Sequence, residues 1–358
     1  MSEHIMLIHG DLLTKERLDT VHNSRCIEHT PKNHFQYVIF LPGLFHYKMA
    51  CADAIWRTYI QPKEGRDDEN SLYQHTAVLR PEETGKMVSK PGFRQVHDVI
   101  HHDIWASMMD CWQIEAENEN WEWNTLETFA ASEPIWDDVV AMSHTIVRKY
   151  VATTPGLDKA RARPSTIRDK RFENQMLRNR DELMYIDVCQ AMNTGDIGRV
   201  EVSFLPWIYI FKATGKHKYA SQMTRFLINL QFNWPEKLRN NLYTKVIYRG
   251  GGPNGTLEHI IKESPLIKVY HNCHVVIENR FHLQHQTIRH AQPEMMNTIR
   301  KLSTKIKENY AHIKKEGRKA LWSIPDQINE GMVLMQEQKI VSEEETGVFD
   351  VDGDDFID

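Results

Sequence analysis

Residues 5–11 read IMLIHGD, and residues 35–43 read FQYVIFLPG. Each is a short, nearly continuous apolar run that stops at glycine beside a polar or turn-forming residue, the pattern of a strand buried on both faces. We therefore predict strands over residues 4–10 and 35–41. Asp11 follows the first strand directly, so this strand delivers a carboxylate to one edge of the predicted sheet.

A helix is predicted after each strand. The first covers residues 12–27, with Thr14 as its N-cap. The second covers residues 44–59 and has apolar side chains at positions 49, 52, 55 and 56. The order strand, helix, strand, helix indicates a small α/β unit.

Helices dominate the rest of the chain. Residues 61–90 are polar and rich in proline and glycine, which predicts a long loop. The fold class we predict is therefore predominantly α with a small α/β part. The expected helices are 93–115, 122–131, 135–152, 166–194, 197–213, 216–231, 236–248, 255–281 and 293–316. The expected domains are an α/β part at 1–60, a loop at 61–92, a helical domain at 93–230, a C-terminal helical part at 231–335, and an acidic disordered tail at 336–358.

Two glycines lie just past predicted helix ends, Gly195 and Gly215, where a left-handed residue commonly closes a helix. Asp196 follows the first of them. We expect its carboxylate to cap helix 197–213 by accepting from the backbone N–H of Gly198 or Arg199. That helix carries mostly apolar residues and should be buried, with Phe204, Leu205, Trp207, Ile208 and Phe211 as its core positions.

Composition narrows the class of protein. The 358 residues carry a net charge of −5, which argues against a surface that binds nucleic acid along its whole length but leaves room for a local basic groove. The five cysteines are odd in number and widely spaced, so we expect a reducing compartment and no disulfide framework. No apolar stretch is long enough for a signal peptide or a membrane span. We expect an intracellular protein, nuclear or cytoplasmic, with no membrane partner.

Asp11 is the strongest candidate for a catalytic residue. A carboxylate at the end of a buried strand is a usual first element of a site that binds magnesium for phosphoryl transfer, so Asp11 is the predicted catalytic and metal-binding residue. The alternative is structural. Asp11 can cap the following helix by accepting from the backbone N–H of Thr14 or Lys15.

Basic residues cluster in two stretches, near positions 159–180 and 300–319. In a chain with net negative charge, such clustering fits a groove for nucleic acid, with DNA as the expected partner. A solvated helix face is the alternative. The predicted nucleic-acid-binding residues are Arg161, Arg163, Arg168, Lys170, Arg171, Lys314 and Lys315.

Several long phrases together resemble one family, the basidiomycete fungal domain of unknown function 6589, which is associated with transposons. The resemblance extends from the N-terminus to about residue 330. The phrases are HGDLLTKERLDT at 9–20, FQYVIFLPGLFHYKMACADAIWR at 35–57, ASMMDCW at 106–112, AMNTGDIGRVEVSFLPWIYIFKATGKHKYA at 191–220, and NNLYTKVIYRGGGPNGTLEHIIKESPLI at 240–267.

The layout of this family resembles transposases with a ribonuclease-H-like core, such as the hAT type. The resemblance implies a remnant of that core, interrupted by a large all-helical insertion at 93–230. Asp11 would be its strand-borne acid, and Mg²⁺ its cofactor if any activity remains.

This sequence departs from the implied pattern in two places. The first acid of such a site would lie on an earlier strand than the chain contains, and an acidic segment expected before NNLYTK is missing between residues 233 and 241. We therefore expect a truncated, inactive transposase-like protein. The alternatives are a helical module that binds nucleic acid or another protein, and an active metal-dependent nuclease or transposase. The sequence predicts no oligomeric state.

Overall fold

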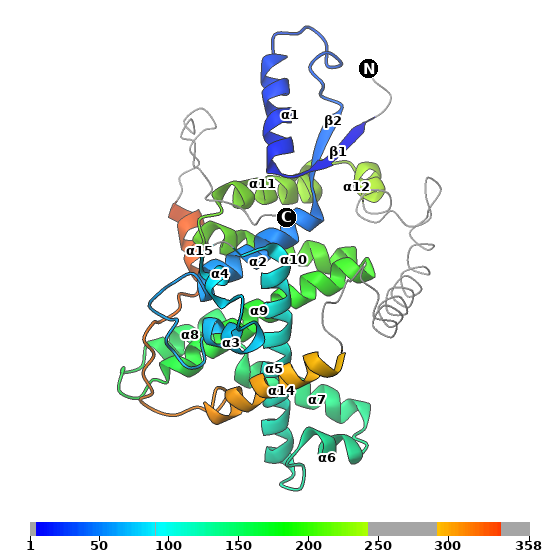
Figure 1. Ribbon diagram of the computed structural model, residues 1–358. Coiled ribbons are helices and arrows are strands. Elements are labelled where there is room, and N and C mark those ends of the chain that lie inside the picture. Colours follow the sequence, from blue (N-terminus) through cyan, green and yellow to red (C-terminus); the bar gives the residue numbers. More distant parts are fainter. Residues whose placement is uncertain (1–4, 90, 243–291, 338–358) are drawn as a thin grey trace. The chain divides into compact units, whose positions relative to one another are not determined.

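The computed structural model describes residues 5–89, 91–242 and 292–337. They form two compact units, and neither is a continuous segment of the chain. The first unit contains residues 5–51, 188–242 and 330–337, and the second contains 52–187 and 292–329. The predicted domains, which are continuous segments, stay a prediction. Figure 1 shows the elements of both units.

The first unit begins with the predicted strand-helix-strand-helix order. The elements are β1 (Met6–Gly10), α1 (Leu12–Ser24), β2 (Val38–Pro42) and α2 (Leu44–Tyr59). The two strands are parallel, with Met6 opposite Val38 and Gly10 opposite Pro42, and α1 packs beside them (Figure 1). Parallel strands need a crossover connection, and α1 supplies it. The predicted small α/β part is confirmed.

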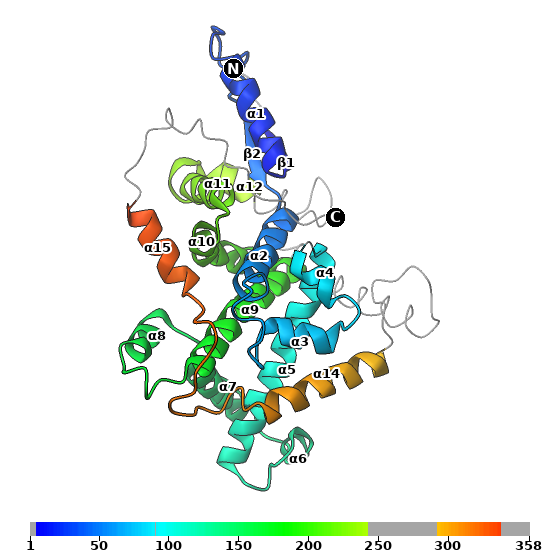
Figure 2. The same ribbon diagram turned by 60° about the vertical axis from the view of Figure 1, so that its left-hand side comes forward.

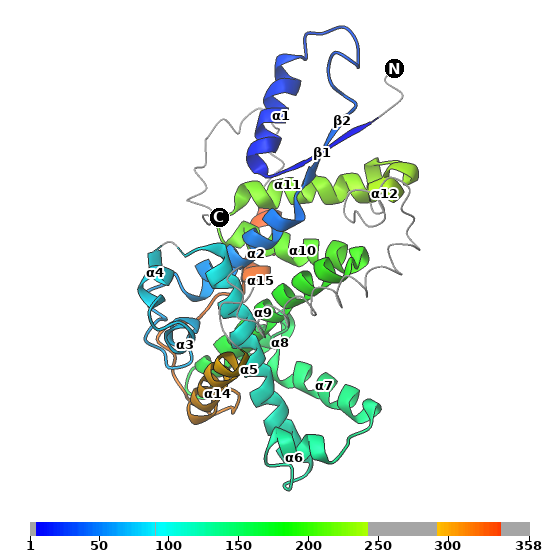
Figure 3. The same cartoon turned by 45° about the vertical axis from the view of Figure 1, so that its right-hand side comes forward.

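Three further helices and a π-helical turn complete the described part of this unit, together with residues 188–194 and 330–337, which belong to helices that the two units share. α10 (Ile197–Ala213) and α11 (His217–Ile228) lie side by side, as Figure 3 shows. Their facing aromatic side chains form the core with Tyr47 of α2. The Tyr47 ring packs edge-on against Phe204 at 5.2 Å, and its hydroxyl lies 2.9 Å from the Ser203 hydroxyl. The remaining elements are η1 (Asn229–Asn233), α12 (Glu236–Leu242) and α15 (Gln327–Glu337).

The junction before α10 forms as predicted. Gly195 has a φ of +70°, in the left-handed region that glycine adopts without strain. Asp196 caps α10, because the Arg199 backbone N–H donates to its Oδ1 at 3.1 Å. Four of the five predicted core residues of α10 are buried, whereas Leu205 is 49% exposed.

The described residues of the second unit form helices and no strand, and these helices are organised around α5 (Phe93–Glu119). α14 (Gln292–Glu308) crosses α5, as Figure 2 shows, and α3 (Leu72–Leu79), α6 (Leu126–Ala131) and α7 (Trp136–Tyr150) also pack on it. One core cluster joins Cys111 of α5 to Met142 and Ile146 of α7. A second joins Ala106 of α5 to α14. The other helices are α4 (Thr84–Ser89), α8 (Thr154–Arg161) and α9 (Lys170–Thr194).

The predicted loop at 61–92 is wrong in part, because it contains α3 and α4. Each spans at most two turns, too short for an apolar period to be recognised among polar residues. The Ser71 hydroxyl caps α3 by accepting from the Gln74 backbone N–H at 3.2 Å. α8 and α15 were also not predicted. The predicted helix 255–281, the end of helix 236–248, and the tail beyond residue 337 lie outside the described residues.

A cluster of charged side chains is buried where α3, α5 and α9 meet. His75 Nδ1 lies 2.5 Å and Arg178 Nε 3.2 Å from the carboxylate of Asp103. Burial opposes the charge on Asp103, but Arg178 and His75 lower the pKa of that carboxyl. Burial and the neighbouring Asp103 carboxylate raise the pKa of Glu182 well above its usual value. Since two adjacent buried carboxyls cannot both ionise at low cost, Glu182 keeps its proton.

Glu182 should make the protein less stable as the pH rises. At pH values below the pKa that Glu182 has in the unfolded chain, the folded and the unfolded protein both hold the proton. At higher pH only the folded protein holds it. The free energy of unfolding therefore falls with rising pH until the pH passes the pKa of Glu182 in the folded protein. Glu182→Gln fixes the neutral form, so its free energy of unfolding should fall less between about pH 5 and pH 8. Denaturant titrations at several pH values measure this. The exposed Glu117→Gln is the control, and identical pH profiles for wild type and Glu182→Gln would contradict the prediction.

Candidate nucleic-acid interface

Asp11 has a structural role in the first unit. It is the N-cap of α1, and its Oδ1 accepts from both the backbone N–H and the hydroxyl of Thr14, each at 2.8 Å. The backbone hydrogen bond from Thr14 lowers the pKa of the Asp11 carboxyl. The prediction that Thr14 is the N-cap is wrong, and the capping alternative for Asp11 is confirmed.

The surroundings of Asp11 offer little for a metal. Within the residues that the structure describes, Asp11 belongs to no group of three or more histidine, cysteine or carboxylate side chains close enough to share an ion. The cavity beside it, which His46 and Tyr47 also line, has a volume of only about 10 Å³. Its role as a catalytic or magnesium-binding residue stays a prediction.

The two predicted basic stretches converge on one cleft in the second unit, which we call the basic cleft. Its volume is about 640 Å³, within the range of about 300–1,000 Å³ of small-molecule sites. Segments around α8 and the start of α9 form one side, and residues 312–314 form another. The basic residues that line the cleft are Lys149, Lys159, Arg163, Arg168 and Lys314.

Asp169 brings these segments together. It is buried at the start of α9 and caps that helix, because the Phe172 backbone N–H donates to its Oδ1 at 3.0 Å. The same carboxylate accepts from the Lys315 backbone N–H at 2.7 Å and from Arg318 Nε at 2.9 Å. Lys314 is therefore held beside the residues that precede α9.

The floor of the basic cleft is apolar. Leu157, Phe172 and Met176 contribute to it, and the half-exposed Ile167 and Ile313 stand at its edge. An apolar floor with cations around it suits a ligand that joins an apolar body to anionic groups.

Lys149 and Tyr150 end α7 at the cleft and share one carboxylate. Lys149 Nζ and the Tyr150 hydroxyl each donate to Glu115 at 2.6 Å. Burial and the hydrogen bond to Glu115 raise the pKa of Tyr150, so its hydroxyl remains a donor. The Tyr150 side chain is thereby fixed in the cleft wall.

The predicted nucleic-acid-binding residues separate into four groups. Arg163 and Lys314 are exposed, line the cleft, and form no ion pair with another described residue. Arg168 also lines it but pairs with Glu173 at 2.5 Å. Lys170 and Lys315 are close in sequence to residues that line the cleft but do not line it themselves. Lys315 Nζ lies 3.3 Å from the centroid of the Tyr310 ring.

Arg161 and Arg171 do not line the cleft and make contacts within the fold, and their role in nucleic-acid binding stays a prediction. Arg161 donates to the Ile324 carbonyl and lies 3.8 Å from Glu173. Arg171 pairs with Glu69 at 2.7 Å. Half-buried guanidinium groups stay charged, so the fold supplies them with acceptors.

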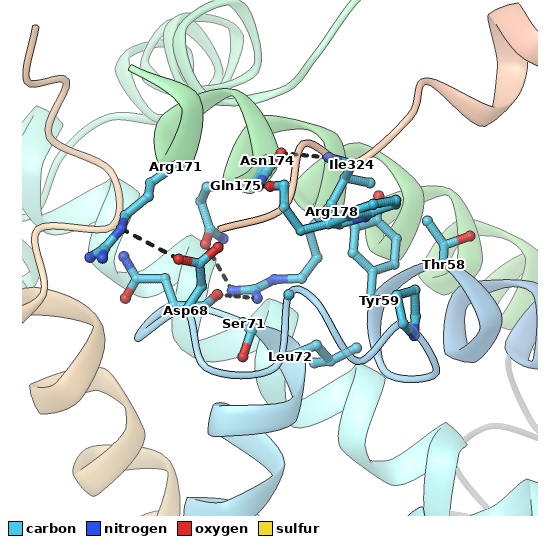
Figure 4. Close-up of a pocket in the computed structure, with 14 residues that line it drawn as sticks. Thr58, Tyr59, Asp68, Ser71, Leu72, Arg171, Asn174, Gln175, Arg178 and Ile324 are labelled. Carbon is cyan, nitrogen blue, oxygen red and sulfur yellow. Dashed lines mark hydrogen bonds and ion pairs between the residues drawn. The ribbon is translucent and has the colours of Figure 1, made fainter. Parts of the chain in front are cut away.

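Figure 4 shows the second cavity of this unit, where Arg171 and Arg178 extend from α9. Arg171 Nε lies 3.7 Å from Asp68 Oδ1, and Arg178 donates to the Asn70 carbonyl at 2.5 Å. The volume of this cavity is about 40 Å³, close to the share of about one water molecule. It is a structural junction, too small for a substrate.

Sequence reasoning missed part of the basic cleft. Lys149, Tyr150 and His312 line it, and Asp110 hydrogen-bonds to His312, yet none of them was proposed. No local pattern marks these residues, because they meet only when α5, α7 and the segment after α14 pack together. Lys159 also lines the cleft. It lies in the first basic stretch, so among these additional residues it alone is marked by the clustering of basic residues in the sequence.

The fold and the cleft define a mostly helical protein with a small parallel β pair and a local basic site. Within the described residues, no helix has the length and apolar character needed to cross a bilayer. The family model described as Family of unknown function (DUF6589) matches residues 1–240, and the chain belongs to this family. The resemblance to this family is thereby confirmed over residues 1–240. No curated protein and no solved structure matches the chain.

Replacing Asp11 should affect the stability of the protein through its cap. Asp11→Ala should lower the free energy of unfolding by about 1 kcal/mol, whereas Asp11→Asn should cost little, because asparagine caps as well as aspartate. Denaturant unfolding measures both.

We expect weak magnesium binding in calorimetry, because one carboxylate does not offset the dehydration of the ion. Tight stoichiometric binding that Asp11→Asn abolishes would show a metal site instead.

Removing the Asp169 carboxylate should weaken the whole second unit. Asp169→Ala removes the carboxylate partner of Arg318 and the cap of α9, so unfolding should require about 3–5 kcal/mol less. The exposed Asp67→Ala, with an expected change within about 0.5 kcal/mol, is the control. Equal effects of the two substitutions in denaturant titrations would exclude a clamping role for Asp169.

Proposed function

We propose that this protein binds nucleic acid through the basic cleft, with the phosphate backbone as the main contact. The observation that carries the proposal is the convergence of two basic stretches, about 150 residues apart, on one cleft. Lys159, Arg163 and Lys314 are exposed there and form no ion pair with another described residue. Cations that the fold does not neutralise remain available for phosphates.

The charge balance of the chain supports a local site. With a net charge of −5, the surface as a whole repels a polyanion at long range. Cations gathered around one concave site still provide a favourable potential there, because low-dielectric walls focus the field. Binding should therefore be confined to the cleft and strongly dependent on salt.

We also propose that the β1–α2 segment derives from a ribonuclease-H-like transposase core and no longer performs metal-dependent catalysis. Two observations support this origin: the parallel pairing of β1 with β2, and the carboxylate of Asp11 directly after β1. The engagement of Asp11 in the cap of α1 supports the loss of catalysis. Nucleic-acid binding by the second unit is compatible with such an origin, and DNA and a nuclear location are the corresponding proposals.

The salt dependence of binding tests the proposed function. Replacing Lys159, Arg163 and Lys314 together with glutamine should weaken binding of a labelled DNA strand. It should also reduce the slope of log affinity against log salt by about 2, since each phosphate contact on a single strand contributes about 0.7. Fluorescence anisotropy at several salt concentrations measures both quantities. The matched control replaces three exposed cations of the same unit outside the cleft: Lys63, Lys86 and Arg300.

The proposal fails if wild-type protein binds no nucleic acid. It also fails if the control and cleft variants lose the same slope, because the charge effect would then be general and would not belong to the cleft.

A further inference from the structure

His312 lines the basic cleft, and one of its ring nitrogens has no hydrogen-bond partner among the described residues. Its Nδ1 is 2.7 Å from Asp110 Oδ2, and its side chain is 0% exposed. Nε2 is also buried and has no hydrogen-bond partner among the described residues. The hydrogen bond to Asp110 favours the tautomer that carries the proton on Nδ1, and in that tautomer Nε2 is an acceptor. A buried acceptor without a partner is unfavourable, so a ligand that brings a donor gains affinity.

One aromatic ring lies next to this histidine, and a second ring lies against the first. The Tyr150 ring meets His312 edge-on at 5.8 Å, and Phe172 lies 6.4 Å from Tyr150 at an angle of 71°. Phe172 is half-buried and lines the cleft, so one part of its ring remains available. Aromatic side chains beside cations are the usual means by which proteins hold the bases of a single strand.

A nucleobase matches all three features of the cleft. It is flat and apolar on its faces, it carries N–H donors on its edge, and the phosphates next to it are anionic. In a duplex the same edge is paired and stacked, so a base can enter a cleft only after it leaves the stack. The cleft volume of about 640 Å³ is sufficient for a ligand of this class.

We infer that the basic cleft receives one nucleotide of a single-stranded nucleic acid. Its base lies against Phe172 and donates an N–H to His312 Nε2, and its neighbouring phosphates contact Lys159, Arg163 and Lys314. This inference rests on the proposed function and narrows it from nucleic acid in general to unpaired strands. Asp110 acts as a positioning residue, because it favours the tautomer of His312 in which Nε2 is an acceptor.

Affinities for three ligands test the inference: a labelled single strand, the duplex of the same sequence, and adenosine monophosphate. The wild-type protein should bind the single strand most tightly. Phe172→Leu keeps an apolar side chain but removes the stacking surface. It should weaken single-strand binding at least about fivefold and leave duplex binding unchanged. Phe129→Leu, the same substitution in the core outside the cleft, is the control for a general loss of stability.

Photo-crosslinking gives a readout that needs no variant. A single strand that carries 5-iodouracil should form an adduct with the peptide containing Phe172 or with that containing Tyr150, which mass spectrometry identifies. An adduct there supports the inference. Absence of this adduct, or equal affinities for strand and duplex that Phe172→Leu leaves unchanged, overturns it.

The two proposals fail in different ways. If the triple cation variant weakens strand and duplex binding equally while Phe172→Leu weakens neither, the proposed function stands and the single-strand inference is wrong. If adenosine monophosphate binds as tightly as the strand, the cleft is a site for free nucleotides and the assignment to a strand is wrong. If none of the three ligands binds, both proposals are wrong.

Discussion

Asp169 joins the start of α9 to the segment around Lys315, because its carboxylate accepts from the backbone N–H groups of Phe172 and Lys315 and from Arg318. Lys315 and Asp169 are 146 residues apart in sequence. A buried carboxylate needs several donors to offset its lost hydration, so the two segments stay together wherever the unit is folded. This junction holds one side of the basic cleft in place, since Lys314 lies next to one of its donors.

The same electrostatic requirement decides which cations remain at the surface. Arg161, Arg168 and Arg171 are partly buried, and each is matched by a carboxylate or a carbonyl group of the fold. Lys159 and Arg163 reach solvent and keep their charge for a ligand. A dense run of basic residues in the sequence is therefore a mixture of structural arginines and available cations, and only the available ones contribute to the proposed phosphate contacts.

Asp11 illustrates how one residue can carry two predictions. Its place after a buried strand suggests a metal ligand, and its distance from Thr14 suggests a cap. The structure shows the cap, because the backbone N–H of Thr14 is within reach whichever other residues surround the strand. Second and third ligands would have to come from other elements, and within the described residues Asp11 belongs to no group of three or more such side chains. Local contacts therefore account for its cap, and its role in metal binding stays a prediction.

The sequence by itself determined the α/β start, most long helices, the caps at Asp196 and Gly195, and the family. Each depends on residues within a few positions of one another, or on long matching phrases. The short helices α3, α4 and α8 were missed because fewer than three turns give no clear apolar period. Only the tertiary structure decided the basic cleft and the place of His312 within it. Its walls come from segments between α5 and residue 314, and their meeting depends on packing and on the buried Asp169, which no local pattern encodes.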